Sequence, residues 1–284
     1  MPFTTIISPS ELSLHPDDPG WAVIDCRFSL DDTERGRRDY LKAHIPGAVY
    51  AHIDEDLSGK KIPGVTGRHP LPEIPVFAET LSRWGVDSGT QAVVYDDSNG
   101  TTAARLWWML KWLGHGSVAL LDGGWAAWNR LGLPSRGGEE SRFRGEFEPR
   151  EVAGAYVRAE QVQQYCNDAG FVILDARSAP RFRGEVEPID PVAGHIPGAV
   201  SAPCEQNVSA DGTFLPPDVL RARFESLVKS VPTENVICYC GSGVTAAHNL
   251  IAIAYAGLGM GRLYADSWSE WITDPARPVA TGAD

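Results

Sequence analysis

The sequence predicts an α/β protein made of two tandem domains, each a doubly wound parallel sheet flanked by helices. Its 284 residues, 43% of them hydrophobic and 22% charged, are enough for two cores of ordinary domain size. Four landmarks occur twice in the same order, and within each copy short apolar runs alternate with longer segments of helical period. This alternation is typical of parallel strands joined by helices that cover both faces of a sheet.

The internal repeat pairs the two halves landmark by landmark. "WAVIDCR", "HIPGAV", "AVVYDD" and "LLDGGWAAW" in the first half correspond to "FVILDAR", "HIPGAV", "VICYCG" and "LYADSWSEW" in the second. The stretch between the halves is polar, contains glycines and lacks apolar periodicity. We therefore expect domains at residues 1–134 and 156–284, joined by a linker at residues 135–155.

Strands and helices follow from the apolar runs and the periodic segments in chain order. In the first copy we expect a strand at 92–96 followed by a helix at 101–114, then a strand at 118–122 followed by a helix at 124–132. In the second copy we expect a buried strand at 235–239 and a helix at 245–257, which ends at a glycine.

Composition excludes several functional classes. The formal charge is -12, and basic residues cluster only in "RGRR" and "GKK", so no surface for a nucleic-acid backbone is expected. The start has no signal-peptide pattern, and no apolar run is long enough to span a bilayer, which favours a cytoplasmic protein. Five cysteines, an odd number, suggest free thiols in a reducing compartment. Without C-x2-C or H-x3-H spacing, we expect no metal site.

The loop after the second copy's buried strand combines a cysteine with two glycines. Cys240 begins the stretch "CGSGV", which leads into the predicted helix, and ligands of such sheets collect at this edge. Gly241 and Gly243 allow the amides of residues 241–246 to turn inward as an anion-binding nest, which stabilises a nucleophilic thiolate. The alternative is that Cys240 is a small core residue, as we expect for Cys238 on the same strand.

A cysteine at the mouth of a nest is compatible with two chemistries. Cysteine phosphatases need an arginine that clamps the phosphoryl oxygens in the pattern C-x5-R, and here Ala246 stands at that position. The loop is better suited to a smaller anion formed on the cysteine itself, such as a persulfide.

The duplicated Asp-x-Arg, "HIPGA" and "DGGW"/"ADSW" landmarks, with "CGSGVTA" in the second copy only, resemble tandem-domain rhodanese-like sulfurtransferases, the 3-mercaptopyruvate and thiosulfate sulfurtransferase family. The resemblance covers almost the whole chain. It implies an enzyme that takes sulfur onto Cys240 as a persulfide and passes it to an acceptor. The loop resembles that of 3-mercaptopyruvate sulfurtransferases, whereas thiosulfate-preferring members typically carry basic residues directly after the cysteine.

The resemblance also implies a set of site residues. "DARSAPRFRGE" is similar to the family's substrate-binding stretch and places an arginine that holds the donor's anionic group at position 181. A second arginine before "GHIPG" is absent, because position 189 is isoleucine, and Arg183 is a possible substitute. A Ser-His-Asp relay known in some members maps to Ser242, His69 and Asp54, which as an alternative are ordinary loop residues. The predicted substrate-binding residues are Arg181, Gly241, Ser242, Gly243, Val244, Thr245 and Ala246.

Other repeated features are expected to be structural. In the first copy Asp96 stands where Cys240 stands in the second, so the first domain is expected to be catalytically silent. The Asp-x-Arg pairs at strand ends predict buried ion pairs, the "HIPGA" histidines a turn, and the tryptophans core anchors. These expectations concern Asp25 with Arg27, Asp175 with Arg177, His44, His195, Trp107, Trp108 and Trp268.

The resemblance implies a small-molecule sulfur donor, a thiol or cyanide as acceptor, a thioredoxin-like reductant as a further partner, and no cofactor. Two other functions stay open. One is a persulfide carrier or sulfide-sensing interaction module, and the other is a cysteine-dependent phosphatase or arsenate reductase that uses the same loop.

Overall fold

The computed structural model describes residues 1–282 and divides into two compact α/β units. The first unit comprises residues 1–59, 72–152 and 210–214, and the second comprises residues 60–71, 153–209 and the chain from 215 onward. Residues 283 and 284, the end of the predicted second domain, lie outside the described residues. In residues 1–282 the helices all fall short of the length and apolarity that a bilayer span requires.

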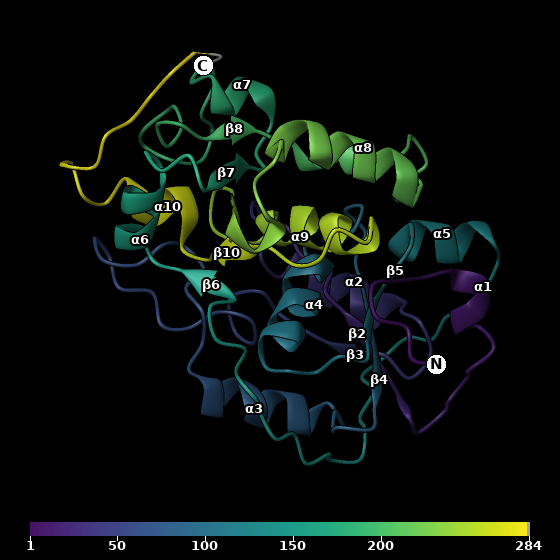
Figure 1. Cartoon of the computed structure of the whole chain (residues 1–284). Helices are drawn as coiled ribbons and strands as arrows, with labels where there is room; N and C mark the ends of the chain where they lie inside the picture. The colour runs from purple at the N-terminus through teal and green to yellow at the C-terminus, as the bar shows by residue number, and fades with distance from the viewer. Residues whose placement is uncertain (283–284) are drawn as a thin grey trace. The chain divides into compact units, whose positions relative to one another are not determined.

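The first unit is built on a five-stranded parallel sheet (Figure 1). In spatial order its strands are β1 (Ile6–Ile7), β5 (Val118–Leu121), β4 (Gln91–Tyr95), β2 (Trp21–Asp25) and β3 (Val49–Tyr50). Its helices are α1 (Pro9–Leu12), α2 (Arg35–Lys42), α3 (Ile74–Arg83), α4 (Ala103–Trp112) and α5 (Gly124–Arg130). Strands β4 and β5 and helices α4 and α5 lie where the sequence predicts them.

The second unit repeats this arrangement (Figure 1). In spatial order its strands are β6 (Tyr156–Val157), β10 (Arg262–Tyr264), β9 (Val236–Tyr239), β7 (Val172–Asp175) and β8 (Val200–Ser201). Its helices are α6 (Ala159–Tyr165), α7 (Ala179–Phe182), η1 (Cys204–Asn207), α8 (Pro217–Val228), η2 (Thr233–Asn235), α9 (Ala246–Tyr255) and α10 (Ser267–Trp271). The two sheets have equivalent strand orders, which confirms the doubly wound α/β fold in two copies.

Helices cover both faces of the second sheet, as parallel pairing requires. Helix α9 packs on β9 and β10, with α8 beside it (Figure 1). The opposite face carries a core in which Trp268 and Trp271 of α10 and Val162 of α6 pack against Ile237 and Tyr239 of β9. Side chains alternate along β9, so Cys238 points away from that core, toward the α9 side. Cys240, two residues further, is directed to the same side.

The Asp-x-Arg landmarks form the predicted buried ion pairs at the ends of β2 and β7. Arg27 Nη2 lies 2.6 Å from Asp25 Oδ2, and Arg177 Nη2 lies 2.6 Å from Asp175 Oδ2. In each unit the guanidinium also donates to a backbone carbonyl, of Ala43 and of Gly194 respectively. These pairs fix the chain where it leaves each sheet.

The histidines of the two "HIPGA" stretches and the tryptophans are structural, as expected. His44 Nδ1 lies 2.7 Å from the carbonyl of Tyr40, and His195 Nδ1 lies 2.7 Å from that of Phe182. Both rings stack on the aromatic ring of that same partner. The side chains of Trp107, Trp108 and Trp268 are fully buried.

Most of the predicted linker is ordered along the first unit. The amide of Gly145 donates to the carbonyl of Ser82, and Phe147 is buried. Two short segments also differ from the predicted division of the chain. Residues 210–214 pack with the first unit, where the amide of Phe214 donates to Asp122, and residues 60–71 pack with the second.

Candidate functional site

Cys240 stands directly after β9, at the start of the loop that leads into α9. Its side chain is 2% exposed, and its sulfur accepts a hydrogen bond from the amide of Gly243 at 3.2 Å. Gly243 has a φ of +74°, and a Cβ atom there would stand 1.9 Å from the carbonyl oxygen of Ala265. Glycine is therefore required at 243 for two reasons, and the turn it makes aims an N–H group at sulfur.

The first residues of α10 form hydrogen bonds with the backbone of the cysteine loop, residues 240–245. The amide of Trp268 donates to the carbonyl of Cys240 at 3.0 Å, and the amide of Ser269 donates to that of Gly241 at 2.9 Å. The amide of Cys240 donates in turn to the hydroxyl of Ser267 at 3.1 Å. These three hydrogen bonds fix the backbone of Cys240 and Gly241.

The other predicted loop residues follow in order along the turn. Ser242 is 7% exposed, Val244 is buried, and Thr245 is the residue that precedes the first turn of α9. Ala246 begins the helix and is fully buried. The loop thus ends at a helix N-terminus, whose amides favour negative charge.

Residues 67–69 of the short segment 60–71 pack against the same loop. The amide of Gly67 donates to Asp266 at 3.1 Å, and a Cβ atom on Gly67 would stand 2.4 Å from the carbonyl oxygen of Asp266. His69, which is 5% exposed, has its Nδ1 2.8 Å from the hydroxyl of Ser242. The structure therefore brings together two members of the predicted relay.

Asp54, the third predicted member, belongs to the first unit. Its amide donates to Nδ1 of His52 at 3.1 Å. Its place in a relay with His69 remains a prediction.

Two arginines lie beside the cysteine loop. The point where a Cβ on Gly241 would stand is 2.9 Å from Nη2 of Arg68 and 3.6 Å from Nη2 of Arg181. Arg181 belongs to α7 and pairs with Glu187 at 2.7 Å, whereas Arg68 pairs with Asp190. Asp190 also accepts from Arg181 at 3.3 Å, so its carboxylate bridges the two guanidinium groups.

Glu187 forms hydrogen bonds with Arg181 and with the turn that carries Asp190. It accepts two hydrogen bonds from Arg181 and one each from the amides of Ile189 and Asp190. Burial on its own raises the pKa of the Glu187 carboxyl, but these hydrogen bonds outweigh burial and lower the pKa below its usual value. Glu187 is therefore a charged anchor that fixes both Arg181 and the turn carrying Asp190.

Arg68 is the residue that the sequence interpretation missed. Arg183, expected as a substitute for the second arginine, instead pairs with Glu185 at 2.7 Å and has 35% of its side chain exposed. Arg68 directly precedes His69, one of the predicted site residues, in "GRHPLP". Nothing local connects it to Gly241, because its partner Asp190 is 122 residues away in sequence.

Two other thiols of the second unit, those of Cys238 and Cys204, are buried. All five cysteines are free. Cys238 is fully buried in β9, and burial raises the pKa of its thiol well above the usual value. Burial likewise raises the pKa of Cys204 to about 12. Both thiols therefore stay protonated and inert at neutral pH, which agrees with the core role expected for Cys238.

In the first unit the equivalent loop encloses a carboxylate. Asp96 follows β4 as Cys240 follows β9, and its side chain is fully buried. Four backbone amides donate to its two oxygens at 2.8 to 2.9 Å, from Ser98, Gly100, Thr102 and Ala103. The hydroxyl of Thr102 donates as well. The amides of this loop are thus satisfied by the loop's own anion.

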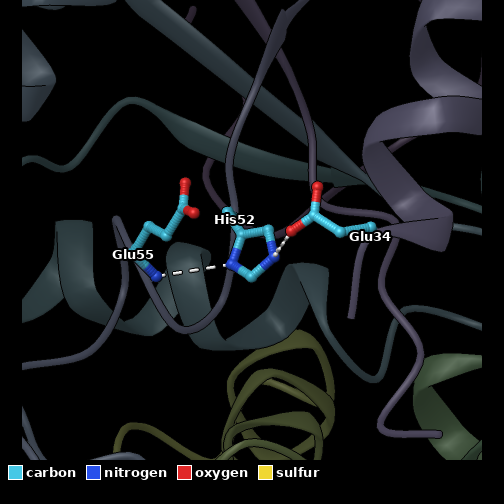
Figure 2. Close-up of side chains that lie close together, drawn as sticks. All are labelled: Glu34, His52 and Glu55. Carbon is cyan, nitrogen blue, oxygen red and sulfur yellow. Dashed lines mark hydrogen bonds and ion pairs between the residues drawn. The ribbon is translucent and has the colours of Figure 1, made fainter. Parts of the chain in front are cut away.

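One cluster in the first unit has the residue types of a metal site. Figure 2 shows Glu34, His52 and Glu55, whose possible ligand atoms lie within 4.8 Å of one another. The histidine's Nε2 lies 3.1 Å from the carbonyl of Thr33, and its Nδ1 accepts the amide of Glu55 at 3.4 Å. Arg37 pairs with both glutamates, at 3.5 and 2.5 Å. Because both ring nitrogens and both carboxylates have protein partners, we interpret this cluster as an ion-pair network.

Known proteins are similar to this chain over nearly its whole length. Residues 8–131 and 158–274 each match the rhodanese-like domain. The chain is 50% identical over 278 residues to the "Probable 3-mercaptopyruvate sulfurtransferase" of Pseudomonas aeruginosa, covering 98% of both chains. SseB of Mycobacterium tuberculosis, 39% identical over 283 residues with 98% and 97% covered, carries a name that gives thiosulfate as the donor.

A solved structure gives the same result. The crystal structure of the 3-mercaptopyruvate sulfotransferase SseA from Escherichia coli superposes with a TM-score of 0.81 at 35% identity, covering 94% of this chain and all of that one. The chain therefore belongs to the rhodanese-like family, with the domain in two tandem copies, and it is a sulfurtransferase.

Proposed function

We propose that the chain transfers the sulfur of 3-mercaptopyruvate to a thiophilic acceptor through a persulfide on Cys240. The observation that carries this proposal is the pairing of a buried, amide-bonded sulfur with a Ser242–His69 hydrogen bond in the same loop. Two arginines beside Gly241 supply positive charge for the donor's carboxylate. The 50% identical relative named for 3-mercaptopyruvate supports the choice of donor.

In the first half-reaction the Cys240 thiolate attacks the sulfur of the donor. A sulfur–sulfur bond forms and the donor's carbon–sulfur bond breaks, so its electron pair passes to the carbon and the leaving group is the enolate of pyruvate. A proton converts this enolate to pyruvate, and the donor's own thiol releases one proton, so protons balance. The Gly243 amide stabilises the anionic sulfur throughout.

In the second half-reaction an acceptor thiolate attacks the outer sulfur of the persulfide. The sulfur–sulfur bond breaks, its electron pair returns to Cys240, and the acceptor leaves as a persulfide. Cyanide attacks in the same way and leaves as thiocyanate. A thioredoxin-like dithiol is a suitable protein acceptor, because its second thiol displaces the sulfur as sulfide.

Ser242 and His69 are proposed to move the proton that the first half-reaction requires. The serine hydroxyl adjoins the reacting loop, and the imidazole at 2.8 Å is the group that exchanges a proton with it. Asp54 is proposed to orient the imidazole. Asp96 cannot accept a sulfur atom, so the first unit is proposed to be catalytically silent.

A single-turnover experiment tests this function. Without an acceptor, 3-mercaptopyruvate should release one pyruvate per chain and add one sulfur atom, about 32 Da, to the peptide that contains Cys240. Pyruvate release without this adduct, or an adduct on Cys204 or Cys238, would contradict the proposal.

The Ser242–His69 pair is expected to matter for one donor only. With 3-mercaptopyruvate, Ser242→Ala should lower kcat by about 10²-fold, because proton transfer to the leaving carbon is lost. With thiosulfate the change should be small, because sulfite leaves without a proton. Steady-state kinetics of Ser242→Ala, His69→Asn and the double variant check this, and the double should equal the singles since the two act as a unit. Ser226→Ala on the surface of α8 is the control, and equal losses with both donors would refute the proton role.

A further inference from the structure

We infer that Asp190 sets the charge of the donor site, so that the site favours the singly charged carboxylate of 3-mercaptopyruvate over the doubly charged thiosulfate. This inference rests on the proposed function and adds the residue that chooses between donors. The comparisons do not make that choice, because the names of similar relatives give both donors.

The position of Asp190 follows from the two arginines. Both guanidinium groups reach within 4 Å of one point on Gly241, the residue after the cysteine. Asp190 is bonded to Arg68 through Oδ1 and to Arg181 through Oδ2, and its side chain is only 3% exposed. Among residues 1–282 the buried Nε of Arg68 has no hydrogen-bond partner.

The charges of this cluster cancel. Three positive and three negative side chains are joined by ion pairs: Arg68, Arg177 and Arg181 with Asp175, Glu187 and Asp190. Arg177 pairs closely with Asp175 and at 3.4 Å with Glu187, and Glu187 also holds Arg181. Glu187 already balances one of the two arginines beside Gly241, so Asp190 is the carboxylate that lowers the remaining net charge there from +1 to 0.

This cancellation affects the two donors unequally. The energy of a charge in the field of Asp190 scales with the charge of the donor, so a dianion is repelled about twice as strongly as a monoanion. The cluster is largely buried, with exposed side-chain fractions of 18% for Arg68 and 15% for Arg181, so salt screens the repulsion only weakly. Repulsion of the wrong ligand is a general route to specificity.

Asp190 is also held in place, so it does not swing aside when a donor arrives. Its amide donates to Glu187 at 3.1 Å, as does that of Ile189, and Glu187 is fixed by Arg181. The carboxylate is thus a permanent part of the site.

Replacing Asp190 with asparagine tests the inference, because it removes the charge and keeps the shape. We expect the ratio of kcat/KM for thiosulfate to that for 3-mercaptopyruvate to rise by about tenfold or more. Arg68→Gln should lower this ratio, and the double variant D190N/R68Q, with its charge balance restored, should return to within about twofold of the original ratio. Glu185→Gln, which removes an exposed charge from the same loop, is the control and should leave the ratio unchanged.

Each outcome decides the question. A merely positional role for Asp190 predicts that both donors lose activity together in D190N, so that the ratio stays unchanged, and this result would overturn the inference. A preference of the unaltered protein for thiosulfate would overturn it as well. If the unaltered protein transfers sulfur from neither donor, the proposed function fails and the inference fails with it.

Discussion

Replacing Cys240 with serine is expected to abolish sulfur transfer from every donor, a loss of at least about 10³-fold in kcat/KM. A serine oxygen in the same loop still accepts the Gly243 amide, but it is not nucleophilic toward sulfur and holds no sulfur as a persulfide. The fold should be unaffected, because the two side chains are nearly isosteric and the backbone of residue 240 is held by Ser267 and Trp268. Steady-state assays with 3-mercaptopyruvate and thiosulfate measure the loss.

The matched control is Cys166→Ser. Cys166 caps the C-terminal end of α6, is partly exposed and donates its thiol to the carbonyl of Gln163. This variant should keep full activity and should still gain the sulfur adduct on Cys240. Sulfur transfer by Cys240→Ser at a rate close to that of the unaltered protein would remove Cys240 from the mechanism.

The duplication made the architecture predictable. Because each strand and landmark of the first copy has a counterpart in the second, one interpretation explained both sheets, and the strand orders are equivalent. The same alignment placed Asp96 opposite Cys240, and both follow a central strand of their sheets. Local chemistry also sufficed for the Asp-x-Arg pairs, whose partners are two residues apart.

The cluster of Arg68, Arg181 and Asp190 beside Gly241 was only partly predictable, because most of its contacts are distant in sequence. Gly67, Arg68 and His69 meet partners 122 to 201 residues away, and the polar segment around them has no periodicity that would reveal a packing surface. The family pattern directed attention to an arginine before "GHIPG". In this chain that stretch supplies Asp190, and the second arginine beside Gly241 is Arg68.

The linker prediction shows the same limitation. Polar, glycine-containing sequence at 135–155 resembles a flexible connection, yet the glycines are needed where the chain lies close to the first unit. A Cβ on Gly145 would stand 2.6 Å from the carbonyl oxygen of Val86, and one on Gly137 would stand 2.9 Å from that of Lys42. Composition does not distinguish glycine that permits motion from glycine that permits close backbone contact.

Replacing Asp96 with alanine is expected to destabilise the first unit by about 3–5 kcal/mol. The change removes the acceptor of four backbone amides and one hydroxyl at a fully buried position, and the neighbouring Asp97 is held by Arg35 instead. Asp97→Ala is the matched control. Its carboxylate pairs with Arg35 at 2.9 Å near the surface, so its loss should cost at most about 1 kcal/mol.

Hydrogen exchange of the full chain locates this effect, because the two units need not unfold together. In Asp96→Ala, peptides from β4 and α4 should exchange much faster, while peptides from β9 and α9 should be unchanged. Equal protection in Asp96→Ala and Asp97→Ala would show that water satisfies the amides as well as the carboxylate does. The two loops are equivalent in position but differ in the side chain that their amides meet. In the first unit a carboxylate accepts four amides and a hydroxyl, whereas in the second unit the Gly243 amide donates to the sulfur of Cys240.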